Sequence, residues 1–577
     1  MRSGNDPPEA MTNRLLTLLS KDRLEQHYRD GLWRSDTIYS LVSERASRHP
    51  DRIAILDRSR QLTYRALIEQ ADVLAAALER RGLKAGQRIA VWVASRIEVA
   101  LALLACSRNG YVCCPSLHRD HTVEDVLQLL RKVRAAGLIV QRGFGADGAR
   151  HDIAARAQAL PSMGCVYVLG SPDEHRDFPL AFPWSREMVG RPAAAAPKDP
   201  DRVVYLPFTS GTTGAPKGVQ HSDNTLLANA RTISRDWNID ADSTVYTLST
   251  LSHNLGFGAM IMTLIVGGKL VVHDLPRGAS LVDRLQATGA TFLFGVPTHA
   301  IDLLAELRKR QRSALPQLKG FRVSGASAPT WVIEELLGHG ITPQSGYGMT
   351  ETCSHQYTRP DDDPKLIMET SGRACDGYEI RIWQSDDPSV EMPVGQIGEI
   401  GGRGASLMLG YFDDQAATEA SFNAQGWFMT GDLGWIDENG YLRITGRKKD
   451  VINRGGHKIH PAKLEGLASQ HPSIERVAAI AVADERLGER VCLAVEFRAG
   501  EAASPAEILQ HLNRAGLSKY DMPEFFLQLD RLPLTASGKV RKVEIVEAVK
   551  SGQKTPVAIG RPATGETAGS RQQAGTG

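Results

Sequence analysis

The sequence predicts an α/β fold of more than one domain, in which parallel β-sheets are flanked by helices. Three observations support this. The chain has 577 residues, of which 42% are hydrophobic, so it is too long for one core and can bury more than one. Short apolar runs alternate with helical patterns through its first half, as in sheets with crossover helices. A second, shorter α/β series occupies residues 447–550.

The first clear helical pattern lies around residues 67–78. Apolar residues recur there every three or four positions. A threonine precedes the pattern as a possible cap, and a glycine follows where the helix would end. The residues concerned are Thr63, Leu67, Ala71, Leu74, Ala75, Leu78 and Gly82.

Strand-like runs then alternate with further helical patterns, which favours a parallel sheet. The expected strands are Ile89–Val93, Leu138–Val140, Val166–Leu169, Val203–Phe208, Leu270–Val272, Thr291–Phe294 and Phe321–Val323, and the expected helices include Ile97–Cys106 and Val123–Val133. In the second series the expected strands are Val477–Val482 and Val491–Phe497, and Ser504-Pro505-Ala506-Glu507 is typical of a helix start with a capping box. Residues 551–577 have almost no large apolar side chains, so a disordered tail is expected there.

Composition excludes several classes of function. The net charge is only +2 and there are no long runs of one sign, so no nucleic-acid partner is expected. Seven scattered cysteines form no CxxC pair, which argues against a zinc site and favours a reducing compartment. The longest apolar run, Leu255–Val266, is shorter than the roughly 20 residues of a membrane helix. We therefore expect a soluble cytoplasmic protein that acts on small molecules.

The stretch 203–219, VVYLPFTSGTTGAPKGV, has the composition of a phosphate-binding loop. Glycines, hydroxyls and one lysine follow a strand-like run, and such groups donate hydrogen bonds to phosphate oxygens. The spacing does not match a Walker A loop, because no serine or threonine follows the lysine. The candidate ligands of phosphate are Thr209, Ser210, Gly211, Thr212, Thr213, Gly214 and Lys217. Alone, such a run is more often a flexible turn.

TSGTTGAPKG closely resembles the signature loop of the adenylate-forming superfamily, which includes acyl- and aryl-CoA synthetases, luciferases and peptide-synthetase adenylation domains. Later motifs follow in that superfamily's order. LSTLSHNLGFG (248–258) resembles the acid-binding motif, with His253 near the carboxylate. VSGASAP (323–329) and GYGMTE (346–351) resemble the adenine-binding segments.

The resemblance implies a role for each matching position. Tyr347 would stack on adenine, Thr350 would contact the α-phosphate, and Glu351 would hold Mg²⁺, which takes oxygen ligands. The remaining implied nucleotide contacts are Gly325, Ala326, Ser327, Gly346, Gly348 and Met349, and the implied acid pocket comprises His253, Asn254, Phe257, Gly258, Gly325 and Ser345. Without the resemblance, a His-Asn pair is more often structural.

The stretch 426–465 and the segment LPLTASGKVRKVEI carry the last motifs. By resemblance, Asp432 would accept the ribose hydroxyls and Arg447 would contact the nucleotide. Lys449 would be the hinge, and Arg454, Gly455, Gly456 and Lys458 would line the tunnel for the pantetheine thiol. Lys539 would be the catalytic lysine that bridges carboxylate and α-phosphate.

The resemblance implies a large N-terminal domain (32–446, after an extension 1–31) with a small distorted β-barrel subdomain, and a small mobile C-terminal domain (447–550). It implies an acid–CoA ligase that uses ATP, Mg²⁺ and CoA. Two alternatives stay open: an aryl-acid ligase of the dihydroxybenzoate or salicylate type that loads a carrier protein, and a non-catalytic protein of the same fold. The identity of the acid and the oligomeric state stay open as well.

Overall fold

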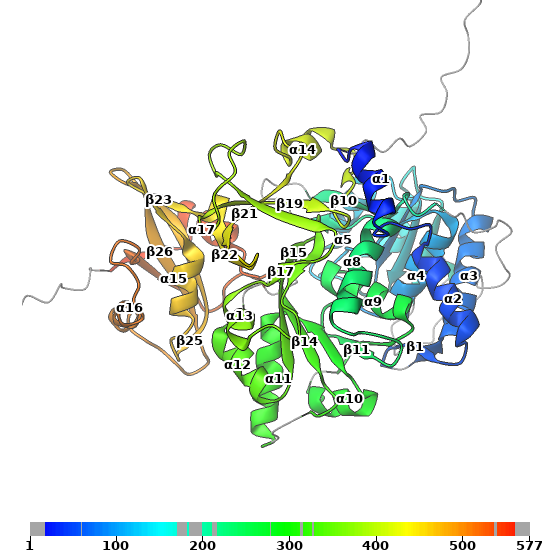
Figure 1. Ribbon diagram of the computed structural model, residues 1–577, viewed down its shortest axis with the longest axis horizontal. Coiled ribbons are helices and arrows are strands. Elements are labelled where there is room, and N and C mark those ends of the chain that lie inside the picture. Colours follow the sequence, from blue (N-terminus) through cyan, green and yellow to red (C-terminus); the bar gives the residue numbers. More distant parts are fainter. Residues whose placement is uncertain are drawn as a thin grey trace, which may run out of the picture. The chain divides into compact units, whose positions relative to one another are not determined.

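A computed structural model describes residues 18–58, 60–169, 182–183, 199–209, 216–276, 278–311, 315–325, 328–535 and 539–559. The chain divides into two compact units, Met1–Ile444 with Ala536–Lys539, and Thr445–Thr535 with Val540–Gly577 (Figure 1). The first unit is the larger, which confirms the prediction of a large α/β domain and a smaller second one.

The first unit contains two sheets of nine strands each within the described residues. The first sheet has the order β17 (Arg373–Ala374), β16 (Cys353–Tyr357), β15 (Thr342–Met349), β14 (Gly320–Ser324), β13 (Phe292–Gly295), β11 (Thr244–Thr247), β12 (Lys269–Val272), β1 (Ile53–Leu56) and β2 (Gln61–Thr63). Its central pairs, from β1–β12 to β14–β15, are parallel. This confirms the parallel sheet expected from alternating strands and helices.

The second sheet has the order β20 (Gly410–Tyr411), β10 (Lys217–Ser222), β8 (Val203–Tyr205), β4 (Val112–Cys114), β3 (Arg88–Trp92), β5 (Gly137–Gln141), β6 (Cys165–Leu169) and β7 (Phe182–Pro183), with β9 (Phe208–Thr209) paired to β10. The expected strand Val203–Phe208 is therefore two strands, β8 and β9, separated by Leu206 and Pro207. Proline lacks the N–H that a continuous ladder would use at this position.

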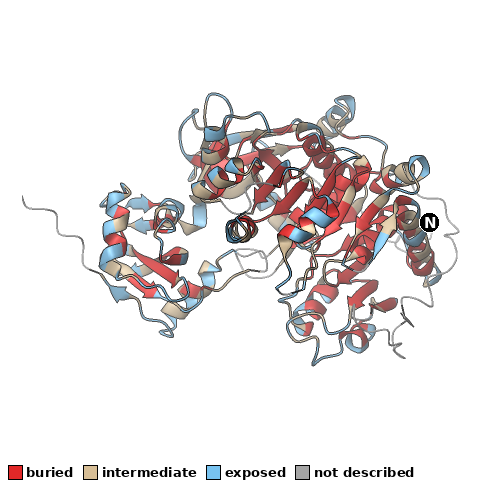
Figure 2. Ribbon diagram, turned by 90° about the horizontal axis from the view of Figure 1, so that it is seen from below, coloured by how far each residue is buried: buried red, intermediate tan, exposed pale blue. Residues whose placement is uncertain are grey.

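A layer of helices lies between these sheets: α2 (Ile38–Arg48), α3 (Tyr64–Arg80), α4 (Ile97–Asn109), α8 (Asp223–Asp236) and α9 (Asn254–Val266). Successive side chains of a strand point to opposite faces of the sheet, so each sheet packs on helices on both sides. On β3, Ile89 and Val91 pack into this layer while Ala90 and Trp92 face the opposite side, where α5 (Val123–Lys132) and α6 (Ile153–Gln158) pack. Buried residues accordingly concentrate in the strands and inner helices (Figure 2).

The outer face of the first sheet packs on α10 (Leu281–Thr288), α11 (Pro297–Lys309) and α12 (Thr330–Gly338). The shorter helices α1 (Lys21–Arg29), α13 (Pro364–Glu369) and α14 (Gln415–Ala420) complete the unit. The resemblance also implied a small β-barrel subdomain; beside the two large sheets, the described chain has a four-stranded sheet of β18 (Tyr378–Trp383), β19 (Gly398–Gly404), β21 (Phe428–Ile436) and β22 (Leu442–Arg447). Its pairing follows an open path.

Several local predictions are confirmed. Thr63 caps α3 by accepting a hydrogen bond from Ala66 N, and Gly82 adopts a positive φ of 80° just beyond the end of the helix. Ser504 and Glu507 form the capping box of α16 (Pro505–Arg514). The apolar run 255–266 lies in the buried helix α9. No helix in the described part of the chain has the length and apolarity needed to cross a bilayer.

The second unit contains a sheet of β24 (His457–Ile459), β23 (Ile452–Arg454), β26 (Gly488–Phe497), β27 (Phe525–Gln528) and β28 (Val557–Ala558), with β25 (Ile474–Asp484) paired to β26. Helices α15 (Pro461–Ala468) and α16 cover one face and α17 (Lys542–Lys550) the other. The expected disordered tail from residue 551 is wrong for residues 557–558, because β28 pairs with Phe525 and Phe526 of β27. Residues 560–577 lie outside the described residues.

Candidate active site

His253 is the N-cap of α9 and presents a neutral imidazole. Its Nδ1 accepts a hydrogen bond from Leu255 N at 3.3 Å, which assigns the ring proton to Nε2. Burial, with smaller electrostatic contributions from His118 and Lys539, lowers the pKa of His253 to about 4. The ring is therefore uncharged near pH 7 and offers an N–H donor at Nε2.

Lys539 belongs to the large unit, although the chain up to Thr535 and from Val540 onward belongs to the small unit. A Cβ placed on Gly325 would lie 3.9 Å from Lys539 Cε and 3.4 Å from Val296 Cγ1. Gly325 directly follows β14 and has a φ of +95°, a conformation that glycine adopts without strain. The structure thus brings together three predicted site residues, His253, Gly325 and Lys539.

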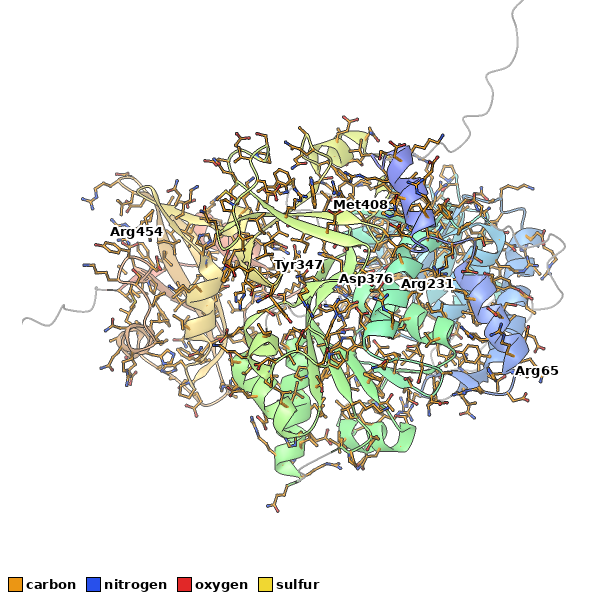
Figure 3. The ribbon with its side chains drawn as sticks, in the orientation of Figure 1. Arg65, Arg231, Tyr347, Asp376, Met408 and Arg454 are labelled. Carbon is orange, nitrogen blue, oxygen red and sulfur yellow. The ribbon has the colours of Figure 1, made fainter. Side chains whose placement is uncertain are left out.

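The segment GYGM lies in β15. The Tyr347 hydroxyl donates a hydrogen bond to Asp432 Oδ2 at 2.8 Å, and the edge of the ring meets His355 at a centroid distance of 5.4 Å (Tyr347 is labelled in Figure 3). A Cβ on Gly348 would lie 2.0 Å from the carbonyl oxygen of Cys353, so the tight return from β15 to β16 requires glycine there. Two predicted nucleotide contacts, on β15 and β21, are therefore neighbours.

Glu351 is 9% exposed and interacts electrostatically with Lys217, the last residue of the predicted phosphate loop. Its carboxylate accepts a hydrogen bond from the Tyr411 hydroxyl at 2.9 Å, and Lys217 Nζ lies 4.8 Å from the centre of the Tyr411 ring. Burial raises the pKa of Glu351, whereas the Tyr411 hydroxyl and Lys217 lower it. The Thr350 carbonyl oxygen accepts a hydrogen bond from His221 Nε2 at 2.7 Å, which fixes the backbone just before Glu351.

A magnesium ion that bridges phosphates fits this donor set. Such ions keep waters and phosphate oxygens as ligands and take one or two protein carboxylates. Glu351 supplies one carboxylate, and no cluster of three His, Cys, Asp or Glu that could hold a metal occurs among the residues described. The Glu351 carboxylate therefore suits a magnesium ion that arrives with a nucleotide.

The predicted phosphate loop connects two antiparallel strands, because Thr209 on β9 pairs with Lys217 on β10. Lys132 donates a hydrogen bond to the carbonyl of Pro216 at the end of the loop. The predicted contacts Ser210, Gly211, Thr212, Thr213 and Gly214, like Ala326 and Ser327 of the second turn, lie outside the described residues.

A cavity of about 30 Å³ lies between α8 and α9, against β13 and β16. It is lined by Leu226, Asn229, Ala230, Ile233, Asn254, Leu255, Gly258, Ala259, Ile261, Met262, Phe294, Cys353 and Ser354. The Asn229 amide is engaged with both backbone groups of Ser354, whereas the Asn254 amide makes no hydrogen bond within the described part of the chain. A Cβ on Gly258 would meet nothing within 4 Å.

The other predicted pocket residues lie elsewhere. Phe257 is fully buried and stacks on Tyr205 with ring centroids 4.2 Å apart, so it packs in the core and does not line this cavity. Ser345 donates its hydroxyl to the carbonyl of Ile367. Gly256 serves packing, because a Cβ there would lie 2.4 Å from the Thr250 carbonyl oxygen.

In the small unit, Gly455 and Gly456 form the turn between β23 and β24 with φ values of 58° and 90°. Arg454 (labelled in Figure 3) pairs with Glu524 at 2.8 Å and donates to the carbonyl of Tyr520. A cavity of about 310 Å³ adjoins it, lined by Arg454, Arg486, Leu487, Arg490, Glu524, Phe525, Ala558 and Ile559. The predicted acceptor turn is thus anchored by an ion pair. Lys458 lies on β24, and Lys449 lies in the 3-10 turn Lys448–Asp450 that follows Arg447 at the end of β22.

Three contacts near these residues could not be found from the sequence. They are three hydrogen bonds: from the Tyr411 hydroxyl to the Glu351 carboxylate, between His221 Nε2 and the Thr350 carbonyl, and between His118 Nδ1 and the Ser252 hydroxyl at 3.0 Å, next to His253 in the chain. Each joins positions more than fifty residues apart. The only available indication was the titratable or hydroxyl side chain itself.

Comparison with known proteins matches two family models: "AMP-binding enzyme" over residues 42–412 and "AMP-binding enzyme C-terminal domain" over residues 463–539. The chain is 31% identical to a medium-chain fatty-acid–CoA ligase of Escherichia coli K12, covering 92% of this chain and 94% of that one. It is also 31% identical to a salicylyl-CoA synthase / salicylate adenylyltransferase of Streptomyces sp, covering 92% and 97%. Among solved structures, ATP-bound MatB from Rhodopseudomonas palustris superposes with a TM-score of 0.77 at 28% identity, covering 89% and 99%.

Proposed function

The chain belongs to the AMP-binding enzyme family, and on that premise we propose that it is an ATP-dependent acid–CoA ligase acting through an acyl-adenylate. In the first half-reaction a carboxylate oxygen bonds to the α-phosphorus of ATP, the bond to the β-phosphate oxygen breaks, and pyrophosphate leaves. In the second, the thiol of CoA loses its proton and bonds to the acyl carbon, and AMP leaves. A carboxylate needs the first step because oxide is not a viable leaving group.

The observation that carries this proposal is that His253, Gly325 and Lys539 lie close together. A lysine there supplies a positive charge where negative charge spreads over the α-phosphate and the attacking carboxylate. The neutral His253 adds an Nε2–H donor without a second positive charge. Gly325, which has no side chain, leaves the backbone open to a flat base, and Tyr347 with Asp432 supplies the ring and the carboxylate for the nucleoside.

Glu351 would hold Mg²⁺, which when bound neutralises phosphate charge and orients pyrophosphate as a leaving group, and the neighbouring Thr350 would contact the α-phosphate. The Tyr411 hydroxyl orients the Glu351 carboxylate, and His221 holds the Thr350 carbonyl. Lys217, the last residue of the phosphate loop, would contact phosphate oxygens. In the small unit, Arg447 would contact the nucleotide and the turn at Gly455 and Gly456 would line the path of the thiol, with Lys449 as the hinge between half-reactions.

The cavity between α8 and α9 favours a ring-bearing or medium-chain acid with an apolar body. Its wall is mainly aliphatic and includes Ile233, Ile261 and Met262. It also includes the amide of Asn254, which makes no hydrogen bond to any of the residues described. A hydrogen bond contributes about 0.5–1.5 kcal/mol net, so a substrate substituent that hydrogen-bonds to the Asn254 amide would be favoured. Because the cavity measures only about 30 Å³, a ring must displace side chains, and Met262 is flexible enough to yield.

Asn254 also favours a second candidate function, a stand-alone aryl-acid ligase that passes the acyl group to the phosphopantetheine of a carrier protein. An ortho hydroxyl would satisfy the Asn254 amide, and one relative is named as a salicylate adenylyltransferase as well as a salicylyl-CoA synthase. All seven cysteines are buried and unpaired, which supports a reducing compartment such as the cytoplasm for either function.

A pyrophosphate-release screen over benzoate, salicylate, cyclohexanecarboxylate and octanoate, with and without CoA, tests both functions. Thioester formation on free CoA supports the acid–CoA ligase. Pyrophosphate exchange with aryl acids alone, without turnover on CoA, favours the carrier-protein ligase. Absence of exchange with every acid would instead indicate a non-catalytic relative.

A further inference from the structure

Arg322, on β14, is a buried arginine that has no acidic partner among the described residues. It is 2% exposed, and none of the ion pairs in the described residues includes it. One guanidinium nitrogen donates to the side-chain oxygen of Gln344, and the group lies 5.6 Å from the centre of the Tyr357 ring. The other two nitrogens, Nε and Nη2, have no hydrogen-bond partner among the residues described.

This arrangement is unfavourable for stability. Burial lowers the pKa of Arg322 to about 10, so the side chain remains charged near neutral pH. A buried charge is normally paired, and replacing such groups by apolar side chains of similar volume is often neutral or stabilising. Unfavourable groups of this kind concentrate at functional sites.

The charge lies directly under the predicted nucleotide site. A Cβ on Gly346 would lie 2.7 Å from Arg322 Nη2, so the guanidinium fills the space beneath the residue that precedes Tyr347. Along its own strand, Arg322 is three residues before Gly325. On the other side, Arg322 is paired in register with Phe294 of β13, which lines the cavity between α8 and α9.

We propose that Arg322 is a positioning residue for acid adenylation, which supports the turns at Gly325 and Gly346–Tyr347 from beneath and favours an anionic nucleotide above them. The inference rests on the proposed function. Arg322 acts through the field of a charge in a low-dielectric interior and through the adjoining backbone, because its own side chain is buried. A packing role alone would explain the volume of the side chain but not its unpaired charge.

Three variants separate charge from packing. Arg322→Met with Gln344→Leu removes the charge together with its one polar partner and leaves two apolar side chains. Gln344→Leu alone keeps the charge and removes its hydrogen bond. Arg322→Lys keeps a charge in a smaller side chain. ATP–pyrophosphate exchange and Tm are measured on the full-length protein for each variant, with KM determined separately for ATP and for the acid.

The double variant should keep or raise its Tm while exchange falls about tenfold, less than the loss for a donor in direct contact with the transition state. That loss should appear mainly in kcat and in KM for ATP. Gln344→Leu should lower Tm with near-normal exchange, and Arg322→Lys should restore most of the exchange. If the double variant does not fold, Arg322→Lys is compared with Arg322→Gln, since both can donate to Gln344 and only the lysine is charged.

Wild-type exchange in the uncharged variants, or exchange that simply follows Tm across the series, would overturn the inference. Failure of the proposed function is distinguishable, because the wild-type protein would then show no exchange with any acid.

Discussion

Lys539→Ala should separate the two half-reactions. Lys539 is grouped with the large unit, close to Gly325, and its charge is felt by His253. Replacing it by alanine removes the positive charge from this cluster and leaves His253 and the backbone in place. The charge is useful mainly while the carboxylate attacks the α-phosphate, so the thioester-forming step has no need of it.

The expected loss in adenylation is about 10²- to 10³-fold, the effect of removing one preorganised charged donor from a transition state. The structure predicts a second measurable effect, on the pKa of His253. Because the charge of Lys539 lowers the pKa of His253, the variant should raise that pKa toward its usual value. A fall in rate with a rise in the pKa of His253 would place the lost charge at the site.

ATP–pyrophosphate exchange measures the first step, thioester formation from supplied acyl-AMP measures the second, and NMR titration follows His253. Lys550→Ala, at the exposed end of α17, is the matched control and should behave as wild type. Equal loss of both half-reactions, with the pKa of His253 unchanged, would show that Lys539 does not act at this cluster.

Three further changes test other parts of the site. Gly456→Trp should block turnover on CoA and spare pyrophosphate exchange, while Gly500→Trp, at another glycine with positive φ (82°) and open space around it, should spare both; normal CoA turnover in the first would place the thiol path elsewhere. Asn254→Leu should lower kcat/KM for salicylate by about tenfold, the value of one hydrogen bond, and leave octanoate unaffected; an equal drop for both acids would assign Asn254 to folding. Tyr411→Phe should raise the pKa of Glu351 further, because the lost hydroxyl favoured its ionised form, so the acidic limb of the adenylation pH profile should move to higher pH; an unmoved limb would mean that Glu351 does not need to ionise.

The local elements could be predicted because their determinants are local. Thr63 and Gly82 bracket α3, and Ser504 and Glu507 open α16. These caps depend on side chains three or four residues away. The buried strands were equally evident, since a run such as Ile89–Val93 packs on both faces. The order of strands in the sheets was not predictable, because β1 pairs with β12 across two hundred residues.

For the candidate site as well, part could be predicted from the sequence and part could not. The positions of His253, Gly325, Tyr347 and Lys539 came from resemblance, and the structure adds where they lie. What the sequence could not supply is the set of residues that act on them from distant strands. Phe257 stays a predicted pocket residue: it is fully buried and stacks on Tyr205, a contact between distant segments that the sequence could not supply.

The burial of both faces of β14 explains why the sequence alone did not single out Arg322. In the run FRVSGASAP an arginine between apolar residues is expected to point to solvent at the end of a strand. Here both faces of β14 are covered, one by the α11–α12 layer and the other by the helices between the sheets. On a strand covered on both faces, successive side chains therefore enter one hydrophobic core or the other. A charged residue at such a position destabilises the fold, and its presence there is explained by a role in function.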